Sequence, residues 1–114
     1  MGKKEHRKSD RIEATHFISY DLLDNEGSVR ENGMALSLDL SREGVLLENR
    51  TDFPQNATVA IYIAVGEDVV DLIGRVRHSE KIDTDKFRIG IQFKSMTDDQ
   101  AEKLAEHYPE LFRQ

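Results

Sequence analysis

Apolar and polar residues alternate along much of this 114-residue chain, and this alternation constrains the fold more than any other feature. The pattern is clearest in residues 58–65 and 86–93, where every second residue is Val, Ile or Phe. A period of two residues is that of a β-strand with one buried face. Both segments are therefore predicted to be strands whose remaining residues, such as Lys86 and Gln92, face outward.

Weaker alternation predicts four further strands, separated by turn-forming residues, at residues 14–23, 29–39, 45–48 and 69–79. In the strand at residues 29–39, Met34, Leu36 and Leu38 are predicted to face the core, so that Asp39 faces solvent or a surface cleft. In the strand at residues 69–79, Gly74 predicts a bulge or sharp bend. Six short strands predict an all-β fold, a small antiparallel barrel or curled sheet.

The period changes near the C-terminus, where a helix is predicted at residues 97–108. Thr97 and Gln100 have the spacing of a capping box, and one stripe of the helix holds Ala101, Leu104, Ala105 and Tyr108. This helix is expected to cover an opening or face of the sheet. Residues 13–114 are predicted to form a single domain. Residues 1–12 have no apolar period and are predicted to form a flexible basic tail.

Composition narrows the class of function. The net charge of −6 disfavours binding to nucleic acid polymers, although residues 1–11 carry five basic side chains against two acidic ones. A basic tail on an acidic body favours a small anionic ligand held locally. No apolar run approaches the length needed for membrane insertion, and no secretory signal is evident, so a cytoplasmic location is expected.

The sequence offers little for catalysis. Cysteine is absent, which excludes thiolate metal sites and cysteine nucleophiles. The four histidines are far apart and lack the spacing of metal ligands. There is no Walker loop, G-x-G-x-x-G or G-x-S-x-G motif. We therefore predict a binding protein with no catalytic residue, metal or cofactor.

Two polar motifs carry the candidate binding residues: R-x-x-x-R at Arg7 and Arg11, and D-x-S-x-x-G at Asp39, Ser41 and Gly44. The second motif, taken alone, is typical of an Asx turn that ends in a bulge. Arginine forks pair with phosphate or with a guanine edge, whereas Asp39 offers acceptors for guanine N–H groups and Ser41 can donate or accept. Gly44 would permit a positive φ or the close approach of another group. A mononucleotide or a phosphorylated peptide would also suit this chemistry.

The two motifs, in this order, resemble those of the PilZ family of cyclic di-GMP receptors. Residues 73–76 and 88–93 also look like the late strands of that family, so the similarity spans roughly residues 6–95. The resemblance implies a six-stranded antiparallel PilZ-type β-barrel with a C-terminal α-helix. It also implies a cyclic di-GMP site formed by Arg7, Arg11, Asp39, Ser41 and Gly44, with His6, Lys8, Arg42 and His78 as further candidates.

Two of these further candidates, His6 and His78, are included because of the positions they occupy in the family's pattern. His6 stands where the family's residue influences whether one or two ligand molecules bind. His78 stands where the family often has an aromatic residue that can lie beside a guanine; an imidazole could also stack there.

The function implied by the resemblance is that of a receptor. Cyclic di-GMP would order the N-terminal tail and thereby change the interaction with an unidentified downstream protein in motility, adhesion or exopolysaccharide control. The alternative is a PilZ-fold adaptor that binds proteins but no ligand. Such relatives usually lack one or both motifs, and both are intact here.

Overall fold

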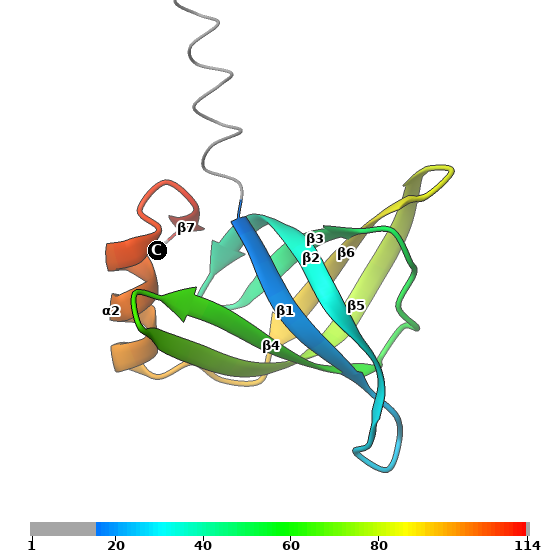
Figure 1. The fold of residues 1–114 in the computed structure, drawn as a ribbon, viewed down its shortest axis with the longest axis horizontal. Helices are drawn as coiled ribbons and strands as arrows, with labels where there is room; N and C mark the ends of the chain where they lie inside the picture. Colours follow the sequence, from blue (N-terminus) through cyan, green and yellow to red (C-terminus); the bar gives the residue numbers. More distant parts are fainter. Residues whose placement is uncertain (1–15, 114) are drawn as a thin grey trace, which may run out of the picture.

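The computed structural model describes residues 16–113, and within them six antiparallel strands close into a barrel (Figure 1). The elements are β1 (His16–Leu23), β2 (Val29–Ser41), β3 (Gly44–Asn49), β4 (Thr58–Val65), β5 (Asp68–Asp83), β6 (Lys86–Phe93), α2 (Asp98–His107) and β7 (Phe112–Arg113). The strands follow the order β1-β4-β5-β6-β3-β2, and pairing of β1 with β2 closes the barrel. The predicted fold class is confirmed. The short strand β7, which runs parallel to the end of β2, was not predicted.

The interior of the barrel is filled by alternate side chains of the strands. Val59 and Ile61 of β4 and Ile89 of β6 are completely buried, as the alternation of these segments predicted. Burying an aliphatic side chain of this size stabilises the fold by about 1.5–3 kcal/mol. A closed barrel also leaves no long exposed strand edge among its six main strands.

The predicted core face of β2 is wrong. Met34 is 62% exposed, whereas Ala35 and Ser37 are almost completely buried. Residues directly opposite each other on paired strands share a face, and Ala35 lies opposite the buried Ile18 of β1. The small side chains of Ala35 and Ser37 therefore line the interior. The Ser37 hydroxyl is satisfied there because it donates to the carbonyl of His16 at 2.8 Å.

Two of the bulges in the barrel wall lie beside predicted site residues. One lies in β2 between Ser37 and Asp39, and the other lies in β5 between Val76 and His78. A bulge or sharp bend was predicted at Gly74, but no bulge is present there, because Gly74 is in regular pairing with both neighbouring strands. A Cβ at Gly74 would stand 2.6 Å from Ile91 Cγ2, so the glycine serves close packing of β5 against β6.

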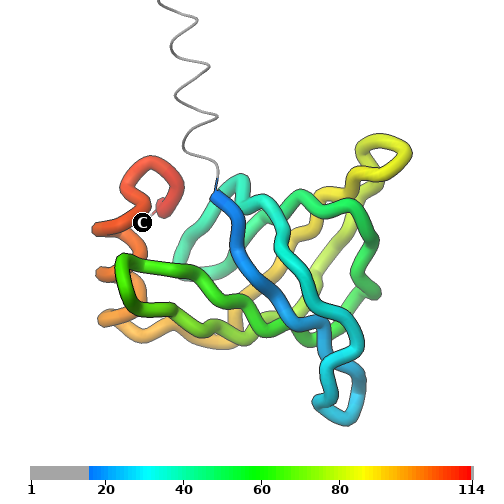
Figure 2. The backbone as a smooth tube through the Cα atoms, viewed as in Figure 1, coloured from blue at the N-terminus to red at the C-terminus, as the bar shows by residue number. Residues whose placement is uncertain are grey.

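The hairpin between β5 and β6 projects beyond the barrel at the end away from α2 (Figure 2). Strand β5 continues to Asp83, further than the sequence predicted. Its last residues pair with the start of β6, through a register irregularity between Lys81 and Asp83.

Helix α2 covers one end of the barrel (Figure 1). Thr97 is its N-cap, and the predicted capping box with Gln100 is present in both directions. Ala101 and Leu104 are buried against the barrel, and the half-buried Tyr108 packs beside them. The predicted apolar stripe therefore makes the contact that holds the helix.

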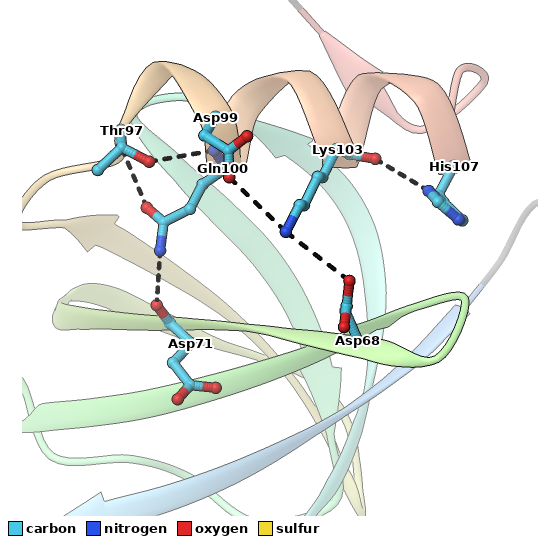
Figure 3. Close-up of polar contacts among 7 residues, drawn as sticks. All are labelled: Asp68, Asp71, Thr97, Asp99, Gln100, Lys103 and His107. Carbon is cyan, nitrogen blue, oxygen red and sulfur yellow. Dashed lines mark hydrogen bonds and ion pairs between the residues drawn. The ribbon is translucent and has the colours of Figure 1, made fainter.

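Polar contacts also fix α2 against β5 (Figure 3). The side-chain amide of Gln100 donates to the carbonyl of Asp71 at 3.2 Å. The ammonium of Lys103 lies 3.8 Å from Asp68 of β5 and 3.6 Å from Asp99 of the helix. These ion pairs are exposed and contribute less to the docking than the buried stripe does.

Candidate ligand-binding site

The two bulges, one in β2 and one in β5, lie on the same outer surface of the barrel, with β3 and β6 between them. In a regular strand successive side chains alternate between the two faces, but a bulge lets two successive side chains point the same way. Val76 is buried, whereas Arg77 and His78 are both exposed. In β2 the bulge likewise sets Asp39 on the outer face before Leu40 returns to the core.

A single row of paired residues connects the bulges. Asp39 of β2 is paired with Leu46 of β3, and Leu46 is paired with Gly90 of β6. Gly90 in turn is paired with His78 of β5. With neighbouring strands about 4.8 Å apart, Asp39 and His78 mark the ends of a row about 14 Å wide.

A surface pocket of about 360 Å³ lies on this row. Asp39, Ser41, Gly44 and His78, which are four of the predicted site residues, all line it. The pocket also contains residues that the sequence did not single out: Glu43, Leu46, Arg77, Gly90, Gln92 and Arg113. The structure thus brings together residues from β2, β3, β5, β6 and β7.

Asp39 is engaged by an arginine from the C-terminal strand. Arg113 donates from Nε to one carboxylate oxygen at 2.7 Å and from Nη2 to the other at 2.8 Å. This bond and the nearby negative charge of Asp39 raise the pKa of Arg113. The side chains are 37% exposed for Asp39 and 68% for Arg113. Asp39 therefore makes a bidentate ion pair with Arg113.

Ser41 and Glu43 shape the turn between β2 and β3. The Ser41 hydroxyl accepts from the Glu43 backbone N–H at 3.2 Å and donates to the Glu43 carboxylate at 3.4 Å. The Glu43 carbonyl accepts from the N–H of Phe93 at 2.8 Å, which ties the turn to β6. The turn therefore holds the Ser41 hydroxyl at the rim of the pocket.

Gly44 is required by the barrel wall. Its φ is not among the positive values, which among the described glycines occur at Gly27 and Gly66. A Cβ at Gly44 would stand 2.1 Å from the carbonyl oxygen of Ile91, far inside van der Waals contact. The close approach that the sequence suggested is therefore to the backbone of β6.

His78 lies over Gly90. A Cβ at Gly90 would stand 2.3 Å from Cε1 of the His78 ring, so only glycine leaves room for the imidazole in this position. Arg77 lies beside it, and its carbonyl accepts from the side-chain amide of Gln55 at 3.2 Å. Within residues 16–113 the Arg77 guanidinium has no ion-pair partner. Among the described residues it therefore presents an unpaired positive charge at the pocket.

Arg42 lies away from this pocket. Its guanidinium is 3.0 Å from Asp98 in the first turn of α2, where it joins the β2–β3 turn to the helix. It lines a different hollow, on the helix side. The remaining predicted residues, His6, Lys8 and both arginines of R-x-x-x-R (Arg7 and Arg11), lie outside the described residues.

The residues that sequence reasoning missed differ in the signal they left. Gln92 was visible as an outward position of an alternating strand. Arg77 stands beside the predicted His78, and only the bulge turns both outward. Arg113 left no signal, because its position depends on the parallel pairing of two residues after the helix.

The family assignment follows from a comparison of the whole chain. The family model described as PilZ domain matches residues 5–108, so the chain belongs to the PilZ domain family. This is a family of cyclic di-GMP receptors, and its domains act by binding. No curated protein and no solved structure matches the chain.

Between His16 and Arg113, no helix is long and apolar enough to cross a membrane. The same residues contain no group of three His, Cys, Asp or Glu side chains placed to hold a metal ion.

Proposed function

We propose that this protein binds cyclic di-GMP at the pocket between the two bulges and passes the signal to a downstream protein. The observation that carries the proposal is the meeting of Asp39, Ser41 and His78 in one pocket of a PilZ domain. Arg7 and Arg11 lie within residues 5–108, the part of the chain that the family model matches.

The chemistry of the pocket suits a guanine nucleotide with phosphates. The Asp39 carboxylate offers two acceptors for the N1–H and 2-amino group of a guanine. The His78 ring offers a flat surface for stacking, and the Arg77 guanidinium offers a fork for a phosphate. A volume of about 360 Å³ is at the lower end for small-molecule pockets. We therefore infer that the pocket holds part of the ligand and that Arg7 and Arg11 contact the rest.

The signal would come from the segment that carries these two arginines. Ligand held by Asp39 and Ser41 on one side and by Arg7 and Arg11 on the other draws residues 1–12 toward the barrel. Part of the binding free energy orders that segment, so the affinity is lower than the number of contacts suggests. The changed surface would be read in the cytoplasm by a downstream protein of motility, adhesion or exopolysaccharide control.

Isothermal titration calorimetry tests the proposal. We expect saturable binding of cyclic di-GMP at tens of micromolar or tighter, a free energy of about −6 to −7 kcal/mol or better. Cyclic di-AMP is the matched control, because it has the same phosphates but lacks the N1–H that Asp39 would accept. Absence of cyclic di-GMP binding would contradict the proposal and favour the ligand-free adaptor.

Variants of the R-x-x-x-R motif extend the same experiment. Arg7→Ala and Arg11→Ala should each weaken binding by about tenfold or more, because a charge-assisted hydrogen bond contributes about 1.5–3 kcal/mol. Thermal melting checks that both variants fold as the wild type does. Normal binding by both variants would remove this motif from the site.

A further inference from the structure

We propose that Arg113 is an internal competitor of the ligand, because its guanidinium occupies on Asp39 the position that the guanine edge needs. This inference rests on the proposed function and deepens it. In this inference Arg113 lowers the affinity of the site for the ligand by occupying Asp39, and it does not need to contact the bound ligand itself.

The ion pair between Arg113 and Asp39 has the geometry of a hydrogen-bonded contact between a guanine and a carboxylate. Arg113 presents two N–H donors, from Nε and Nη2, to the two oxygens of Asp39 at 2.7 and 2.8 Å. The N1–H and 2-amino group of guanine are likewise two parallel N–H donors attached to one carbon. Both groups therefore make the same pair of parallel hydrogen bonds with a carboxylate.

The two contacts exclude each other. One carboxylate accepts only one fork along the line of its two oxygens, and Arg113 lines the same pocket as Asp39. A guanine that reaches Asp39 in this geometry must first displace the arginine. Ligand affinity is then reduced by the fraction of molecules in which the ion pair is formed.

The displacement needs movement of a side chain and not of the whole C-terminal strand. Leu111 and Phe112 are 8% and 5% exposed, and Phe112 is paired with Leu40 of β2. Detaching β7 would expose both apolar side chains to water. The Arg113 side chain is 68% exposed and is free to swing away while β7 remains in place. Glu43, in the same pocket, offers the released guanidinium a second acidic neighbour.

The size of the effect follows from the exposure of the pair. Exposed ion pairs contribute little, so removal of the competitor should tighten binding by only about two- to fivefold. The test must therefore preserve charge, because loss of a positive charge would itself weaken the attraction for the ligand phosphates. Arg113→Lys keeps the charge and removes the fork.

Calorimetric titration of cyclic di-GMP into the wild type, Arg113→Lys and a control provides the test. Arg75→Lys is the control, because Arg75 is exposed on the outer face of β5 but does not line the pocket. We expect Arg113→Lys to bind about two- to fivefold more tightly and Arg75→Lys to bind as the wild type does.

The outcomes separate the inference from the proposed function. Equal or weaker binding by Arg113→Lys, with normal binding by the wild type, overturns the competitor and leaves the receptor function standing. No binding by any of the three proteins overturns both. A second readout is the NMR signal of the Arg113 Nε–H, which should shift at saturating cyclic di-GMP while the Phe112 amide stays protected; an unchanged Nε–H signal overturns the inference.

Discussion

Asp39 of β2 and His78 of β5 lie at the two ends of one row of paired residues, and each is turned outward by a bulge in its own strand. Between them lie Leu46 and Gly90, which form the floor of the pocket. The carboxylate and the imidazole are thereby placed on a rigid wall and not on loops. Such placement favours a site whose geometry is set before the ligand arrives.

The Asp39 carboxylate should decide the affinity for ligand. Asp39→Asn replaces one acceptor oxygen by a donor and removes the charge, so we expect cyclic di-GMP binding to fall by about tenfold or more. Stability should change by less than about 1 kcal/mol, because the pair with Arg113 is exposed. Calorimetry and urea unfolding measure the two effects. Asp71→Asn, an exposed carboxylate of β5 outside the pocket, is the control and should change neither by as much.

Arg77 and Arg75 provide a comparison within one strand. Both are exposed on the outer face of β5, but only Arg77 lines the pocket. Arg77→Ala should weaken cyclic di-GMP binding several-fold and reduce its dependence on salt, because one contact to phosphate is lost. Arg75→Ala should leave both nearly unchanged. Equal effects of the two substitutions in calorimetry at two salt concentrations would show that only the general charge of the strand matters.

Two glycines of the site should behave differently when each is replaced by alanine. At Gly44 the added methyl group meets the Ile91 carbonyl, which is backbone and cannot move without distorting the barrel. We expect Gly44→Ala to lower the free energy of unfolding by about 1–3 kcal/mol or more. At Gly90 the methyl group meets the exposed His78 ring, which can swing away.

Gly90→Ala should therefore cost little stability but weaken ligand binding, because the methyl group displaces the His78 ring from its position over residue 90. Urea unfolding and calorimetry of the two variants check this contrast. A Gly44→Ala protein as stable as the wild type would mean that the wall at β3 and β6 tolerates the methyl group, contrary to the geometry.

Ionisation of Tyr62 should make the free energy of unfolding fall at high pH. Tyr62 donates to Asp21 at 2.8 Å, and this hydrogen bond, followed by burial, raises the pKa of Tyr62 above 10.0. A folded-state pKa above the unfolded value favours the neutral phenol, so its stabilisation is complete below about pH 10 and is lost as pH rises through the folded pKa. Urea unfolding of the wild type and Tyr62→Phe between about pH 8 and 11 measures it. The wild type should lose more stability than the variant, and parallel curves would contradict the assignment.

The sequence predicted the fold well wherever a strand was regular. The alternation of β4 and β6 and the capping box at Thr97 depend on local pattern alone, and the structure contains both. The prediction was wrong at Met34, because small Ala35 and Ser37 fill the interior there and the larger apolar side chains stay outside. Hydrophobicity alone does not show which face of such a strand is buried.

The candidate site was predictable in its residue types but not in its geometry. The motif identified Asp39 and Ser41, and the resemblance added His78. That these residues share a pocket depends on two bulges and on the register of four strands, which no local pattern specifies. The fork from Arg113 depends on how the chain docks after α2, and for this reason the sequence did not indicate it.

The most direct test of the proposed receptor function is an NMR titration of the backbone amides with cyclic di-GMP. We predict saturable shifts that concentrate on the β2–β3 turn from Asp39 to Gly44 and on Arg77, His78 and Gly90 across the barrel wall. Amides of the turn between β1 and β2, around Asp24 and Gly27, lie at the end of β2 remote from Asp39 and should change little. No shifts at saturating ligand, or shifts centred on Asp24 and Gly27, would contradict the proposed site.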